Sequence, residues 1–134
     1  MKKKQVLILA VLAAVIIIAA GAKIGIRHIE VSHDKKISEI AISNVDLSKV
    51  ADGAYTGSYK VFPVAAEVKV TVTDHKIIGI ELLKHSNGQG TPAEIIPDKV
   101  VEAQTLEVDI VTGATSSSKV ILKAIENALN SAIK

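Results

Sequence analysis

Residues 54–84 read AYTGSYKVFPVAAEVKVTVTDHKIIGIELLK, and this stretch decides the fold. Apolar and polar residues alternate along three runs, 54–62, 66–73 and 76–84, as they do in strands with one buried face. Pro63 ends the first run, and a tight turn at 74–75 separates the other two. The short connections predict an antiparallel meander. Its expected inward residues are Tyr55, Gly57, Tyr59, Val61, Val68, Val70, Val72, Ile78, Ile80 and Leu82.

Helical patterns follow the meander. Apolar residues at helical spacing predict a helix over 92–104, with a break near Pro97. The brief alternation over 106–111 indicates a short strand, and the stripe over 120–133 is typical of an amphipathic helix packed on one side. The lead-in, 27–51, fits a short helix, an irregular segment or a strand equally. We therefore expect a small α+β domain, an antiparallel sheet packed with helices, over 52–134.

The composition excludes several classes of protein. There is no cysteine, which rules out disulfides, iron–sulfur clusters, thiolate zinc sites and cysteine nucleophiles. The net charge of +2 comes from the N-terminal segment, because the lysines at positions 2, 3, 4 and 23 outweigh a slightly acidic remainder. With three aromatic residues and no basic patch, a nucleic-acid partner is not expected. The histidines are scattered, so we expect no metal site.

The N-terminal segment, 1–26, has the features of a membrane-spanning helix. A basic run precedes seventeen residues without charge, Val6 to Ala22. The lysines at the start favour a cytoplasmic N-terminus, which places the following domain outside the cytoplasm. A cleaved signal peptide is the alternative, since Ala20-Gly21-Ala22 is a suitable cleavage site.

One hydroxyl-rich stretch, 109–118 (DIVTGATSSS), stands directly before the last predicted helix. A helix N-terminus presents unpaired N–H groups and a partial positive charge, so it can hold a phosphate. Gly113 and Ala114 would let the phosphate approach the backbone, and the hydroxyls, Ser116 among them, would donate to it. The simpler interpretation is a turn followed by Ser116 or Ser117 as the N-cap. Neither a P-loop nor a serine-hydrolase elbow is present, and no catalytic residue is predicted.

The segment Asp109-x-x-Thr112-Gly113-Ala114-Thr115 resembles the D-x-x-[S/T]-G-A-[S/T] flavinylation motif of FMN-binding domains. Such domains form the C subunit of the sodium-pumping NADH:quinone oxidoreductase, and also occur as membrane-tethered electron-transfer proteins. The run Asp52-Gly53-x-Tyr55-x-Gly57 also resembles the entry to their first strand, so the resemblance covers roughly 44–134.

The resemblance implies a role for each matching residue. Thr115 would carry FMN through a phosphoester bond, made by a magnesium-dependent flavin transferase that uses FAD. Asp109, Thr112, Gly113 and Ala114 match the recognition residues. His85, in a glycine-containing loop with Asn87, Gly88 and Gly90, would lie in the flavin pocket; the alternative is a solvated loop histidine.

These observations together predict a membrane-anchored, extracytoplasmic flavoprotein that carries electrons, more in the manner of a redox subunit than of a stand-alone enzyme. Redox proteins or a quinone-linked membrane complex are the expected partners. Three alternatives stay open: non-covalent FMN, a flavin-free sensory or structural module of the cell surface, and a reductase with its own substrate.

Overall fold

The computed structural model describes residues 2–86 and 90–133 and divides into two compact units, one ending at Lys35 and the other beginning at Lys36. Helix α1 (Lys3–Ser38) makes up the first unit and runs into the second. Its segment Lys3–Ala22 is long and apolar enough to cross a membrane, and none of it is buried. A membrane span and a signal sequence both have these properties.

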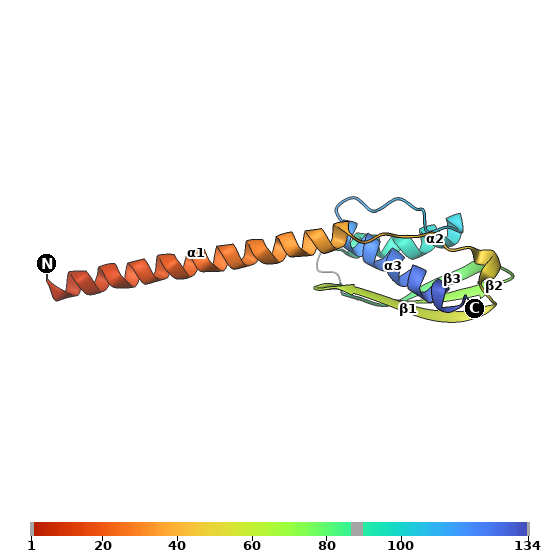
Figure 1. The fold of residues 1–134 in the computed structure, drawn as a ribbon, viewed down its shortest axis with the longest axis horizontal. Coiled ribbons are helices and arrows are strands. Elements are labelled where there is room, and N and C mark those ends of the chain that lie inside the picture. The colour runs from red at the N-terminus through yellow and green to blue at the C-terminus, as the bar shows by residue number, and fades with distance from the viewer. Residues whose placement is uncertain (1, 87–89, 134) are drawn as a thin grey trace. The chain divides into compact units, whose positions relative to one another are not determined.

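The second unit contains a three-stranded antiparallel sheet in the order β1-β2-β3 (Figure 1). The strands are β1 (Gly53–Val61), β2 (Val64–Thr73) and β3 (Lys76–Ser86), as the alternation predicts. Asp74 and His75 both have left-handed φ angles, 51° and 58°, which suits the turn of a two-residue hairpin. The expected meander is therefore confirmed.

One inward residue of the meander is predicted wrongly. Ile78 is 59% exposed, whereas its neighbour Ile77 is buried. The cause is a β-bulge: Thr71 pairs with Gly79 and Val72 pairs with Ile77, which leaves Ile78 without a partner in the register. An extra residue in one strand shifts the alternation by one, so the inward residues on its two sides no longer follow a single period of two.

Helices cover one face of the sheet (Figure 1). Helix α3 (Thr115–Ser131) packs on β1 and β2, and its apolar stripe is buried as expected. The short helix η2 (Thr91–Ile95) leads into α2 (Ile96–Ala103), which packs on β3. The helix expected over 92–104 is divided into η2 and α2 just before Pro97, as predicted. Pro97 lies in the first turn of α2, where proline is tolerated.

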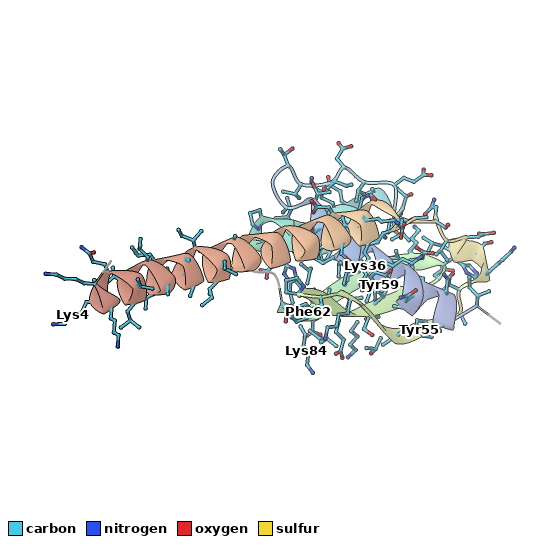
Figure 2. All side chains as sticks on the ribbon, turned by 60° about the vertical axis from the view of Figure 1, so that its left-hand side comes forward. Lys4, Lys36, Tyr55, Tyr59, Phe62 and Lys84 are labelled. Atoms are coloured by element: carbon cyan, nitrogen blue, oxygen red, sulfur yellow. The ribbon has the colours of Figure 1, made fainter. Side chains whose placement is uncertain are left out.

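The contact between α3 and β1 is close at one position. A Cβ atom on Gly57 would overlap the backbone of Ala124 and Ala128 in α3. The tyrosines of β1 lie on either side of this contact, with Tyr59 nearer the Phe62 end of the strand and Tyr55 nearer the other (Figure 2). Both are partly buried against the core, as core packing predicts. Gly57 thus lets α3 lie directly on the sheet.

The segment 106–111 is not a strand, contrary to the sequence prediction. A new strand needs a free sheet edge, but the edge of β3 at Ile77 is bonded by a side chain. The Gln104 amide accepts from Ile77 N and donates to Ile77 O, both at 2.8 Å. Leu106 N donates instead to Asn44 Oδ1 at 3.2 Å. Side chains thus hold this segment as an irregular connection.

Residues 36–51 of the lead-in belong to the second unit. Ile37, Ile40 and Val45 belong to the hydrophobic core. Buried Glu126 of α3 accepts from Ser43 N at 3.2 Å and pairs with Lys123 at 3.1 Å. After the short helix η1 (Leu47–Lys49), an isolated bridge joins Val50 to Ile133 near the end of the chain. The lead-in is therefore irregular between Glu39 and η1 and fixed to α3.

Candidate functional site

The first turn of α3 has free backbone donors. Its N-cap is Ala114, which has no side chain able to cap, and the first intrahelical bond runs from Ser118 N to Ala114 O at 2.9 Å. The amides of residues 115–117 consequently have no backbone or capping acceptor in the described part of the chain. The expectation that Ser116 or Ser117 is the N-cap is therefore wrong. Three N–H groups and the positive end of the helix dipole remain for a ligand.

The turn before α3 depends on glycine. Gly113 has a φ of +83°, which L side chains rarely adopt, and Ala114 N donates to Val111 O at 3.0 Å to close the turn. No atom lies within 4 Å of a Cβ built on Gly113, so glycine is needed here for its backbone angle rather than for space. The turn leaves Thr112 and Gly113 exposed.

An open cavity of about 330 Å³ lies beside this turn. It is lined by the start of β2, by the residue before η2 and by the start of α3: Val64, Gly90, Gly113, Ala114, Thr115, Ser116 and Ser117. Thr115 is exposed, and Ser116 is partly buried. Four of the predicted site residues, 113–116, therefore lie together at one hollow. Sequence reasoning missed Val64, because its place at the cavity depends on how the hairpin packs.

Two hydroxyls of the hydroxyl-rich stretch 109–118 have partners within the protein. Ser118 Oγ accepts from Val111 N at 3.1 Å, so it holds the turn. Ser117 Oγ lies 2.9 Å from His85 Nε2. Both serines are buried. Thr115 and Ser116 are left as the hydroxyls at the cavity wall that have no such bond among the described residues.

His85 lies behind the cavity wall, near the end of β3. Its side chain is only 2% exposed, so the interpretation as a solvated loop histidine is wrong. Its Nδ1 lies 3.0 Å from Glu94 Oε1 of η2, and its Nε2 contacts Ser117. Sequence reasoning missed Glu94, which is nine residues away and carries no motif. The loop positions 87 and 88 that accompany His85 lie outside the described residues.

Asp109 lies apart from the cavity. It is exposed and lines a separate depression of about 430 Å³, with charged neighbours at Lys99, Glu102 and Glu107. The described residues contain no group of three His, Asp or Glu side chains that could hold a metal ion. The structure thus separates Asp109 from Thr115, although the two belong to one motif.

Comparison with known proteins identifies a family for this part of the chain. Residues 64–130 match the FMN-binding domain family. The NADH:acrylate oxidoreductase of Vibrio harveyi is 35% identical over 92 residues, which are 66% of this chain and 9% of that protein. An uncharacterized protein of Treponema pallidum is 25% identical over 123 residues, which are 90% of this chain and 34% of that protein. The chain thus spans about a tenth and a third of these relatives.

A solved structure supports the fold. The crystal structure of the CPE2226 protein from Clostridium perfringens superposes with a TM-score of 0.51 and 23% identity, covering 62% of this chain and 88% of that one. At this level of identity the likeness concerns the fold alone.

Proposed function

The chain belongs to the FMN-binding domain family, and from this premise we propose that it carries electrons through FMN linked by a phosphoester bond to Thr115. FMN is the cofactor. The observation that carries the proposal is the exposed threonine at a helix N-terminus whose amides are free, beside an open cavity. The relative from Vibrio harveyi is named as an oxidoreductase, which supports a redox role for such a domain.

The residues at the cavity fit a flavin phosphate. The free amides of residues 115–117 supply N–H donors, and the helix dipole favours negative charge there. Gly113 has no side chain to obstruct the backbone, and Val64 offers an apolar wall. When bound, FMN supplies the redox chemistry, while the protein supplies binding, orientation and electrostatics.

The reacting group that this chain supplies for attachment is a hydroxyl. In the proposed reaction the Thr115 oxygen bonds to the phosphorus of the FMN half of FAD, and the bond from that phosphorus to the AMP half breaks. The hydroxyl proton is released, and AMP leaves. A magnesium-dependent flavin transferase supplies the catalytic groups, so Thr115 has to be accessible to a second protein, and it is exposed.

The N-terminal helix supports a membrane anchor. With a cytoplasmic N-terminus, the domain lies outside the cytoplasm, where a covalent bond keeps FMN from being lost. The proposed partners are redox proteins or a quinone-linked membrane complex at the same membrane. We propose that 52–134 forms the flavin-binding unit, joined to the anchor, 1–26, by the lead-in, 27–51.

The test is the intact mass of the full chain after co-expression with a flavin transferase and FAD. The expected product carries one FMN, and its yellow colour survives denaturation. Thr115→Ala should abolish the adduct while changing the free energy of unfolding by less than about 0.5 kcal/mol, because the side chain is exposed. Thr115→Ser keeps the hydroxyl and should still be modified. Ser116→Ala is the matched control: it removes the neighbouring hydroxyl and keeps that of Thr115, so it should still form the covalent adduct.

Three results would contradict the proposal. Flavin that leaves on denaturation indicates non-covalent FMN. A colourless chain, under conditions that modify a known acceptor, indicates a flavin-free module. An adduct that persists in Thr115→Ala places the bond on another residue.

A further inference from the structure

The hydrogen bonds around His85 have a defined direction. A carboxylate only accepts, so the proton on the Nδ1 atom of His85 is donated to Glu94. In the neutral ring the other nitrogen, Nε2, is then an acceptor, and the Ser117 hydroxyl donates to it. In the neutral ring Glu94 therefore determines the tautomer, and through it the orientation of the Ser117 hydroxyl.

We propose that His85 is the positioning residue of the attachment site, an inference that rests on the proposed function. Through Ser117 it holds the first turn of α3 against β3 and η2. It thereby fixes the Thr115 hydroxyl and the free amides at the cavity wall before any flavin is present. His85 acts through Ser117 and does not itself line the cavity.

The contacts explain why this position matters. His85 links β3, η2 and α3. Two of those elements border the cavity, since Gly90 immediately precedes η2 and Ser117 is in α3. A shift of the first turn of α3 would move the cavity wall. Displacing a reacting group by about 1 Å can lower a rate on the order of 100-fold.

The same contacts remove two hydroxyls from the reach of the transferase. The Ser117 hydroxyl is bonded to His85, and both Ser117 and Ser118 are buried. A buried hydroxyl bonded within the protein cannot reach the phosphorus of FAD held by another enzyme. His85 therefore contributes to keeping Ser117 from modification, and of the two hydroxyls left at the cavity Thr115 is the more exposed.

Two substitutions of His85 separate its two contacts. The terminal amide of glutamine reaches the place of Nε2, so His85→Gln keeps a partner for Ser117 and loses Glu94. The amide of asparagine reaches only the place of Nδ1, so His85→Asn keeps Glu94 and loses Ser117. We expect attachment kcat within roughly threefold of wild type for His85→Gln and on the order of 100-fold lower for His85→Asn. The KM of the transferase for the chain should not change in either variant.

A purely structural role predicts something else. Both variants would then slow attachment in proportion to their loss of stability, and that result would overturn the proposal. Gln104→Met is the control, because it breaks the bonds of another partly buried side chain to Ile77 in β3, away from the cavity lining. It should lower the free energy of unfolding and leave the kcat of attachment unchanged.

A second measurement does not depend on flavin. The amide ¹H and ¹⁵N chemical shifts of residues 115–117 are recorded on the flavin-free full chain in detergent micelles. Both variants lose the ring current of the imidazole, so the shifts should move further in His85→Asn, which also loses the bond to Ser117, than in His85→Gln; equal changes in both variants would overturn the positioning role. If wild type takes up no flavin, the proposed function fails, whereas this comparison still decides the role of His85.

Discussion

The close contact between β1 and α3 predicts the effect of Gly57→Ala. The added Cβ would lie 2.8 Å from Ala128 Cα, and nearer still to Ala128 N and Ala124 O. All three atoms are backbone, so no side-chain rotation relieves the overlap and α3 has to move off the sheet. Overpacking of this kind costs up to about 3 kcal/mol. Replacing glycine in a strand returns roughly 0.5–1 kcal/mol. The net expected loss is about 2 kcal/mol, or roughly 10 °C in Tm for a unit of this size.

The assay is urea denaturation of the flavin-free full chain in detergent micelles, followed by tyrosine fluorescence. The chain has two tyrosines and no tryptophan, and both tyrosines lie in β1, so the signal reports on this interface. Gly79→Ala is the matched control, since a Cβ on Gly79 in β3 meets nothing within 4 Å. It should leave stability unchanged or raise it slightly. Equal free energies of unfolding for the two variants would refute the reasoning.

Three further predictions concern the turn, the motif and a cap. Gly113→Ala should cost about 1–2 kcal/mol from backbone strain alone, because its φ is +83° and its Cβ meets no atom; urea denaturation measures this. Asp109→Ala should raise the KM of the transferase for the chain and leave stability within about 0.5 kcal/mol, since Asp109 is exposed outside the cavity; attachment kinetics and denaturation together check it. The hydroxyl and then the amide of Ser48 lower the pKa of Asp46 below its ordinary 3.8. The ionised Asp46 therefore stabilises the folded state fully above its ordinary pKa, and this stabilisation is lost as the pH falls through the lowered pKa. The difference in the free energy of unfolding between wild type and Asp46→Ala should accordingly narrow from about pH 6 to about pH 3.

The strands could be predicted because each buries one face and the connections are short. Val68, Val70 and Val72 are fully buried, as alternation requires. The same rule fails at Ile78, because a bulge depends on how two strands pair and leaves no mark in the period. It fails again over 106–111, where alternation is present but Gln104 bonds to the sheet edge. A local pattern determines which face of a strand is apolar and does not determine whether a partner strand exists.

In the site, too, local features could be predicted from the sequence and contacts between distant segments could not. The motif and the helix after it placed residues 113–116 together, because they are adjacent in sequence and the turn is local. The contacts of Ser117 with His85 and of His85 with Glu94 join three elements, and no spacing in the chain predicts them. The position of Asp109 outside the cavity was equally hidden, since three residues of irregular chain separate it from Gly113.

The hydroxyl run at the start of α3, residues 112–118, contains more donors than one helix cap requires, and the contacts explain the excess. Ser118 closes the turn through Val111, and Ser117 ties α3 to His85. Both are buried, so neither competes for a phosphate held by another protein. Ala114 at the N-cap leaves three amides free, which a serine or threonine cap would have used in part. An uncapped helix start costs stability, about 1 kcal/mol on average. A turn selected for stability alone would have a cap here, so the missing cap supports a ligand at the amides and an attachment role for Thr115.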